Sequence, residues 1–324
     1  MVAKNTAPHP IVSSRGETTP AGQRLNTQMA SLLLRLPANV EGDFFVDESC
    51  IDCDACRQIA PASFHQRNGQ SAVYRQPVSY SELLDAKKAL LACPTGSIGS
   101  VVRHPMTDAL SVFPERIDGE VYRCGFTSEK SFGAFSYLVR TSQGNLLIDS
   151  PRFSGPVVRN IERLGGVSLM LLTHADDVAD HEKFSARFGC RRLLHRADVR
   201  AATSMIEIQP NDRSPFEVSP GTFVIPVPGH TAGHVVFLHE EKYLFSGDHL
   251  AWDEKRERLY AFRNACWYSW DEQIRSMEAL LDYRFEWVLP GHGRPVHLEA
   301  GRMKKELAAC IDWMAGSRNK ARVL

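Results

Sequence analysis

The sequence has no excess of charge of either sign and no long hydrophobic run. Its 324 residues contain 38 Lys and Arg against 38 Asp and Glu, so the formal net charge is zero. A balanced chain lacks the basic surface by which proteins bind nucleic acid or anionic membranes. The longest apolar stretches, such as 169–172, are far shorter than the roughly 20 residues of a membrane-spanning helix. We therefore expect neither nucleic acid nor a membrane as a partner.

The chain also lacks the even cysteine spacing of a secreted disulfide scaffold. Four of its eight cysteines are scattered singly, which is typical of a reducing compartment. No apolar core of a secretory signal precedes them, so a cytoplasmic location is favoured. Residues 1–40 are rich in Ser, Thr and Pro, and their first 35 residues hold one acid, Glu17. They predict a disordered or extended leader; an organelle transit peptide, leading to a stroma or matrix, is the alternative.

Ordinary composition and length predict a soluble protein of two domains after this leader. Hydrophobic residues make up 43% and charged residues 23% of the chain. The first domain, 41–104, is predicted as a small α+β unit with strands at 42–47 and 98–103 around a helix at 81–92. A unit of about 60 residues is small for a free-standing core, so a cofactor is expected to stabilise it.

The second domain, 105–324, alternates β-like and helical patterns and is predicted to be a layered α/β fold. The β-like runs lie at 135–140, 146–149, 168–173, 192–195, 222–227, 235–239, 243–246 and 287–289. Helical patterns lie at 157–164, 271–281 and 298–313.

The first domain carries the cysteine pattern of an iron–sulfur site. Cys50, Cys53 and Cys56 form C-x2-C-x2-C, and Cys93 is followed by Pro94. Three thiolates at this spacing hold three corners of a cubane, and the remote cysteine closes the fourth. A zinc site normally comes as two separated cysteine pairs. From Phe44 to Val101 the chain resembles a single-cluster bacterial-type ferredoxin, which implies a [4Fe–4S] cluster that carries electrons or supports the fold.

The second domain places His or Asp beside Gly or Pro after several β-like runs, where side chains are presented at the rim of a sheet. These segments contain Asp149, Thr173-His174-Ala-Asp176-Asp177, Asp180-His181, Pro228-Gly229-His230 with His234, Gly247-Asp248-His249, and Pro290-Gly291-His292-Gly293. One such histidine is usually structural, but four histidine-containing segments in order (173–181, 228–234, 247–249 and 290–293) indicate a metal site.

From about 135 to 293 this order of motifs resembles the metallo-β-lactamase-fold hydrolases, and Pro228–His234 is especially similar to the glyoxalase II branch. The resemblance implies an αββα sandwich with two metal ions at one edge of its sheets. It also implies that His230, Asp248 and His292 are metal ligands, with Asp248 bridging the two ions.

The first motif departs from the family pattern H-x-H-x-D-H, because Asp176 replaces the second histidine and two extra residues precede Asp180 and His181. We assign His174, Asp176 and His230 to one metal, and Asp180, His181 and His292 to the other. Asp177 is an alternative to Asp176 or Asp180, and helix capping is an alternative for both Asp176 and Asp177. Mixed carboxylate and imidazole ligands suit iron or manganese as well as zinc.

The favoured function is hydrolysis of a small thioester, lactone or ester by a metal-bridging hydroxide, with Asp180 orienting the water. The ferredoxin-like domain would then be structural, a redox sensor or a docking element. The alternative is a non-haem diiron oxidoreductase that receives electrons from its own cluster, since flavodiiron proteins of the same superfamily carry a similar carboxylate. A redox partner protein would then be involved. The sequence does not indicate an oligomeric state.

Overall fold

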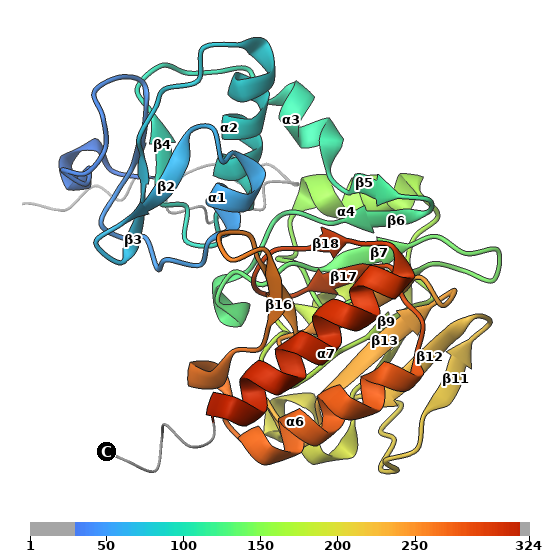
Figure 1. The fold of residues 1–324 in the computed structure, drawn as a ribbon. Helices are drawn as coiled ribbons and strands as arrows, with labels where there is room; N and C mark the ends of the chain where they lie inside the picture. The colour runs from blue at the N-terminus through green and yellow to red at the C-terminus, as the bar shows by residue number, and fades with distance from the viewer. Residues whose placement is uncertain (1–29, 318–324) are drawn as a thin grey trace, which may run out of the picture.

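The computed structural model describes residues 30–317, which form two domains packed against each other (Figure 1). Most of the expected leader lies outside these residues. Residues 30–40 hold the short 3-10 helix η1 (Leu32–Leu34) and then join the first domain. The backbone N–H of Leu36 donates to Val46, and that of Glu48 donates to Leu34, both at 2.9 Å. This described part of the leader is therefore an edge of the first domain.

The first domain is built around one long helix and two pairs of short strands. β1 (Phe44–Val46) pairs antiparallel with β4 (Ile98–Ser100), as the sequence predicts. A capping box between Ser79 and Glu82 fixes the start of α2 (Tyr80–Ala92). The sequence did not predict α1 (Ala55–Ile59) or the hairpin of β2 (Phe64–Arg67) and β3 (Gln70–Val73).

The second domain begins after α3 (Thr107–Val112), which packs between α2 and α4. Its first sheet has six strands in the order β10-β9-β8-β7-β6-β5, with β8, β9 and β10 parallel and the others antiparallel. Their bounds are Glu115–Asp118 (β5), Val121–Arg123 (β6), Tyr137–Val139 (β7), Leu146–Ile148 (β8), Leu169–Leu171 (β9) and Arg191–Leu193 (β10).

The second sheet also has six strands, in the order β11-β12-β13-β14-β17-β18, and only β14 and β17 are parallel neighbours. Their bounds are Phe216–Ser219 (β11), Thr222–Pro226 (β12), Val235–His239 (β13), Tyr243–Gly247 (β14), Trp287–Pro290 (β17) and Val296–His297 (β18). A separate hairpin joins β15 (Ala251–Asp253) to β16 (Arg258–Tyr260).

Helices cover the outer sides of the two sheets. Successive side chains of a strand point to opposite faces of its sheet, so each sheet has apolar side chains on both faces. In β12, Val224 belongs to the core shared with the first sheet, whereas Ile225 packs with the helices. α6 and α7 cover the second sheet (Figure 1), and α4 and α5 contribute buried side chains to the core of the first. The bounds are Gly155–Arg163 (α4), His181–Phe188 (α5), Trp270–Ala279 (α6) and Ala300–Ser317 (α7). The expected αββα sandwich behind a small α+β domain is confirmed.

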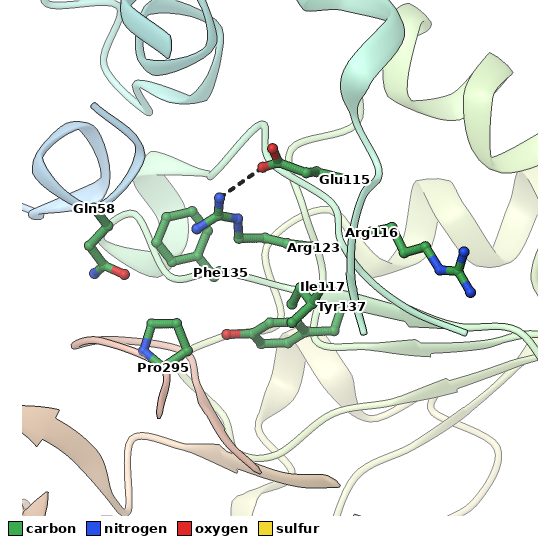
Figure 2. Close-up of a pocket in the computed structure, with 8 residues that line it drawn as sticks. All are labelled: Gln58, Glu115, Arg116, Ile117, Arg123, Phe135, Tyr137 and Pro295. Carbon is green, nitrogen blue, oxygen red and sulfur yellow. Dashed lines mark hydrogen bonds and ion pairs between the residues drawn. The ribbon is translucent and has the colours of Figure 1, made fainter. Parts of the chain in front are cut away.

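The interface between the domains contains a cavity of about 220 Å³. Gln58 from α1 faces Arg123 and Phe135 of the second domain across it (Figure 2). The Arg123 guanidinium lies 5.1 Å from the Phe135 ring centroid and 2.9 Å from Glu115. Glu115 also pairs with Lys88 of α2 at 2.8 Å, so charged contacts join the domains.

Within residues 30–317, no helix combines the length and the apolar character that crossing a membrane requires.

Candidate metal centre

Four loops that follow strands meet at one edge of the sandwich. His174 and Asp177 follow β9 of the first sheet, whereas the other loops leave the second sheet after β12, β14 and β17. In the parallel pair of β14 and β17, Gly247 lies opposite Pro290. The register therefore brings Asp248 and His292, which come shortly after these positions, to the same place.

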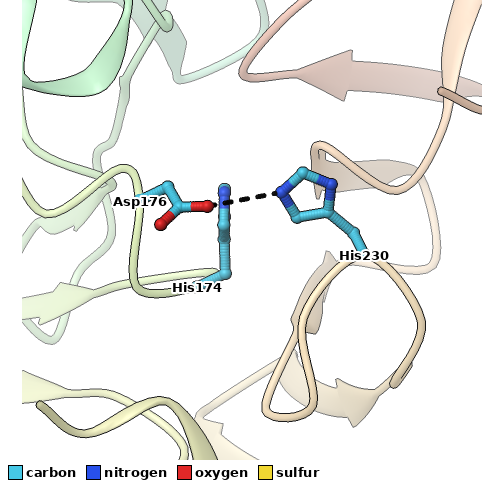
Figure 3. Close-up of side chains that lie close together, drawn as sticks. All are labelled: His174, Asp176 and His230. Carbon is cyan, nitrogen blue, oxygen red and sulfur yellow. Dashed lines mark ion pairs between the residues drawn. The ribbon is translucent and has the colours of Figure 1, made fainter. Parts of the chain in front are cut away.

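Two overlapping groups of side chains converge there. In the first, one ligand atom each of His174, Asp176 and His230 lie within 4.8 Å of one another (Figure 3). In the second, the same spacing holds for His174, Asp177 and Asp248. Asp248 Oδ2 lies 3.8 Å from Nε2 of both His174 and His230, so its carboxylate stands between the two groups.

His292 completes the cluster through Asp248. Its Nδ1 lies 2.8 and 2.9 Å from the two oxygens of Asp248. Burial alone would lower the pKa of His292, but the carboxylates of Asp248 and Asp177 outweigh burial and raise the pKa to about 10. Asp177 and Asp248 thus both bring negative charge to this edge.

Several buried atoms in the cluster lack a hydrogen-bond partner among residues 30–317. They are Nε2 of His174, both ring nitrogens of His230 and both carboxylate oxygens of Asp177. Burial lowers the pKa of His174, which favours the neutral imidazole with a free lone pair, and raises the pKa of Asp177. Buried carboxylates without partners are costly unless they are paired or bind a metal. These donors therefore fit two divalent cations.

A buried relay orients His174. The Thr173 hydroxyl lies 2.9 Å from His174 Nδ1 and 3.0 Å from both oxygens of Asp149. The Thr173 backbone N–H also donates to Asp149 at 2.8 Å. If the hydroxyl donates to the carboxylate, it accepts from Nδ1–H, and Nε2 keeps its lone pair toward the centre. Asp149 therefore contacts His174 through Thr173.

Asp198 ties two of the loops together, and sequence reasoning missed it. Its carboxylate accepts hydrogen bonds from the Ala175 N–H at 2.9 Å, the Thr231 hydroxyl at 2.6 Å and the Gly233 N–H at 2.7 Å. Because these donors flank His174 and His230, Asp198 fixes the distance between the two histidine loops. No motif surrounds Asp198 that would have revealed it.

Asp180 and His181 do not join the cluster, which corrects the expected second ligand set. The Asp180 carboxylate accepts from the Phe153 N–H at 2.9 Å and pairs with Lys130 and Lys183, each at 3.0 Å. His181 opens α5, and its Nδ1 lies 3.1 Å from the Arg192 guanidinium. Both side chains are thus engaged elsewhere, and Asp177 stands beside Asp248 in place of Asp180.

The remaining rim histidines surround the cluster. The His234 ring stacks on His174 at 4.8 Å, and its Nε2 accepts from the Asp248 N–H at 3.2 Å. His249 is fully buried with both ring nitrogens unpaired within the described chain. Nδ1 of His195 accepts from the backbone N–H of Ala197. His234 therefore packs directly against His174 and Asp248 of the metal centre.

The four cysteines of the first domain converge on their own site. Cys50, Cys53, Cys56 and Cys93 are free thiols that line one small cavity. Burial raises the pKa of Cys53 to about 12 and that of Cys56 well above its usual value. Four thiolates become stable there only with positive charge among them, which the iron ions of a cluster supply. The set fits a [4Fe–4S] cluster.

Comparison with known proteins gives one family match and several partial relatives. Residues 46–100 match the family described as the 4Fe-4S single cluster domain of Ferredoxin I. The chain is 37% identical over 109 residues to a hydroxyacylglutathione hydrolase of Cereibacter sphaeroides, covering 32% of this chain and 42% of that protein. It is 33% identical over 112 residues to one of Xanthomonas oryzae pv. oryzae, covering 34% and 43%. The chain thus spans less than half the length of these relatives. The resemblances to a ferredoxin and to glyoxalase II are confirmed.

Solved structures with a similar chain include two bacterial proteins. A metallo-beta-lactamase from Pontibacter korlensis has a TM-score of 0.48 and 18% identity, covering 62% of this chain and 97% of that one. A metallo-beta-lactamase of Cronobacter sakazakii with an HARLDQ motif has a TM-score of 0.41 and 19% identity, covering 62% and 91%.

Proposed function

We propose that this protein is a metal-dependent hydrolase that cleaves a thioester of a hydroxy acid. The observation that carries the proposal is the convergence of unpaired buried donors on His174, His230 and Asp177 around the Asp248 carboxylate. The relatives described as hydroxyacylglutathione hydrolases indicate the bond, since their name denotes a hydroxyacyl thioester of glutathione.

Two divalent ions would be held by the two overlapping groups. His174, Asp176 and His230 would hold one, Asp177 and His292 the other, and Asp248 lies where both can share it. Such ions lower the pKa of bound water toward neutrality and polarise a carbonyl oxygen. Asp177 offers two free carboxylate oxygens to this space, so it can accept a proton from the attacking water.

The substrate would enter beside His230. The Asp176 carboxylate is 36% exposed there and lies 3.1 Å from Arg200, which brings positive charge to the entrance. Trp267 and Tyr268 are exposed large side chains, and their backbone N–H groups both donate to the His230 carbonyl. This pair provides an apolar wall for the substrate and holds the His230 loop from outside.

The proposal is tested by metal and sulfide analysis of anaerobically purified protein, followed by hydrolysis of a hydroxyacylglutathione. We expect about four irons and four sulfides in the cluster plus about two further ions. His230→Ala should lower the bound metal and abolish hydrolysis. The matched control is His297→Gln. His297 is half exposed and stacks on Trp287, and it is not among the side chains of the candidate metal centre.

Three results would count against the proposal. Full metal retention in His230→Ala would contradict the ligand assignment. Less than one ion beyond the cluster would contradict a metal-dependent hydrolase. About six irons with a diiron Mössbauer signal, together with no hydrolysis, would instead indicate redox chemistry at this centre.

A further inference from the structure

One short turn of the second domain lies directly against the iron–sulfur site. Gly133 has a φ of +86°, and a Cβ at this position would lie 2.6 Å from Cβ and 2.8 Å from Sγ of Cys53. It would also lie 3.4 Å from Pro94, next to Cys93. Only glycine allows both this backbone conformation and this close approach. The turn is therefore shaped to the surface of the cysteine loop.

The same turn also holds His292 of the candidate metal centre. The Phe132 carbonyl lies 3.4 Å from His292 Nε2, and the two rings are 6.1 Å apart. The Phe135 N–H donates to the Gly291 carbonyl at 2.8 Å, just before His292. Nδ1–H donates to the Asp248 carboxylate, which can only accept. If a metal displaced that proton, donation of Nε2–H to the Phe132 carbonyl would keep the Nδ1 lone pair toward the metal, the arrangement by which proteins orient metal-binding histidines.

Four further hydrogen bonds, from three residues of the second domain, tie the flanks of the cysteine loop to that domain. The backbone N–H and hydroxyl of Thr127 both donate to the Ala92 carbonyl, at 3.2 and 2.7 Å, immediately before Cys93. Arg294, two residues after His292, donates to the Arg57 carbonyl beside Cys56 at 3.3 Å. Arg152 donates to the Leu91 carbonyl at 2.8 Å. The cysteine loop is thus joined to the second domain on more than one side, including the loop that carries His292.

The turn itself has a backbone that its surroundings must maintain. Phe132 has a φ of +46° and is followed by Gly133 at +86°, so a non-glycine residue occupies the left-handed region. The Phe132 side chain is 54% exposed and cannot fix this conformation by burial. Residues in such conformations persist only where neighbouring structure imposes them. Within the turn, the Phe132 N–H donates to Glu129 at 3.1 Å and the Gly133 N–H to Ser128 at 2.8 Å. Cys53 and Pro94 on one side and His292 on the other are the neighbours that lie against it.

We propose that the cluster-bearing cysteine loop positions His292 through the Phe132–Gly133 turn, so that the iron–sulfur cluster sets the metal affinity of the hydrolytic centre. Gly133 is a positioning residue in this arrangement. The cluster fixes Cys53, Cys53 fixes the turn, and the Phe132 carbonyl fixes the orientation of the His292 ring. The proposal rests on the proposed function, because it takes His292 as a metal ligand.

The first experiment compares Gly133→Ala with a matched control in the full-length protein. Gly189→Ala is the control, since Gly189 has a φ of +67° and no atom within 4 Å of an added Cβ. Both variants place alanine in the left-handed region of φ, but only the methyl group of Gly133→Ala would clash with Cys53. Zinc affinity is measured anaerobically by competition with a chromogenic chelator, and the cluster by absorbance and sulfide content.

We expect Gly133→Ala to weaken zinc binding roughly 10- to 100-fold, the range seen when the groups that orient metal ligands are lost. Gly189→Ala should leave zinc affinity unchanged. Wild-type zinc affinity in Gly133→Ala would overturn the proposal. If Gly133→Ala does not fold, Thr127→Val replaces it, because this variant removes the hydroxyl bond to Ala92 without adding bulk and should weaken zinc binding in the same direction.

The second experiment removes the cluster by Cys53→Ser. The three remaining thiols also bind zinc, so zinc at the centre is counted as the difference between Cys53→Ser and a Cys53→Ser/His230→Ala double variant. We expect weaker zinc binding at the centre, and an unchanged affinity would overturn the proposal. Failure of the proposed function is distinguishable, because wild-type protein would then bind no zinc beyond the cluster or fail to hydrolyse the thioester. Absence of zinc binding in the wild type overturns both.

Discussion

The carboxylate of Asp198 accepts a hydrogen bond of 2.6 Å from the hydroxyl of Thr231, which follows the metal-centre histidine His230. The same carboxylate binds the backbone N–H groups of Ala175 and Gly233. Three donors from two loops thus converge on one buried acid. The spacing of the two histidine loops depends on a residue that itself touches neither imidazole by a hydrogen bond.

Asp198→Asn is expected to destabilise the protein and lower its metal content. The amide would turn an NH₂ group toward donors that need an acceptor, which costs about 1–3 kcal/mol for each buried group left unpaired. Chemical denaturation and metal analysis measure the two effects. Asp212→Asn, an exposed substitution in the same domain, is the control. Wild-type stability in Asp198→Asn would show that the three bonds do not hold the loops.

Thr173→Val is expected to weaken zinc binding roughly 10- to 100-fold. The substitution keeps the shape of the side chain but removes the hydroxyl between Asp149 and His174 Nδ1. Without it, nothing selects the tautomer of His174 that directs a lone pair to the centre. Chelator competition measures the affinity. Thr173→Ser restores the hydroxyl and should restore binding; if serine and valine behave alike, the relay has no such role.

Asp177→Asn and Asp180→Asn test which of these two aspartates is a metal ligand. The structure indicates Asp177, whereas the sequence pattern predicted Asp180. Asp177 faces Asp248 with both oxygens unpaired among the described residues, so its loss should reduce bound metal and hydrolysis. Asp180 pairs with two largely exposed lysines, and its replacement should cost about 1 kcal/mol of stability and leave the metal in place. Metal analysis of both variants decides, and the opposite pattern would restore the sequence assignment.

Cys53→Ala is expected to remove the visible absorption of the iron–sulfur cluster, because one corner of the cubane loses its ligand. Cys266→Ala is the control, since Cys266 lies in the second domain and its thiol donates to the Gly229 carbonyl. Absorbance and sulfide content are measured on anaerobic samples. An unchanged spectrum in Cys53→Ala would mean that the cluster uses another ligand set.

The sequence predicted elements well where the pattern was local. Val235–Leu238 is an uninterrupted apolar run, and the strand Val235–His239 extends it by one residue. His230, Asp248 and His292 each follow a β-like run beside a glycine, so their position at the sheet edge could be expected. The hairpin of β2 and β3 in the first domain has few apolar residues in either strand, so hydrophobic periodicity gave no signal for it.

The parts that could not be predicted depend on contacts between distant residues. Asp180 and His181 stand in a motif-like pair, yet Lys130, 50 residues before Asp180, pairs with the acid, and Arg192 binds the histidine. Both side chains are held by those partners, whereas a carboxylate oxygen of Asp177 lies within 4.8 Å of ligand atoms of His174 and Asp248. Asp198 likewise acts through Thr231, 33 residues later, and nothing near it in the chain signals that contact.

The candidate centre draws its side chains from both sheets of the sandwich. His174 and Asp177 leave the first sheet after β9, whereas Asp248 and His292 leave the second after β14 and β17. An ion bound by both groups would fasten the sheets to each other, and its binding energy would add to the stability of the whole domain. Amide hydrogens in β8 and β14 would then exchange more slowly together when zinc is added. A chelator would loosen the entire sandwich rather than its loops alone.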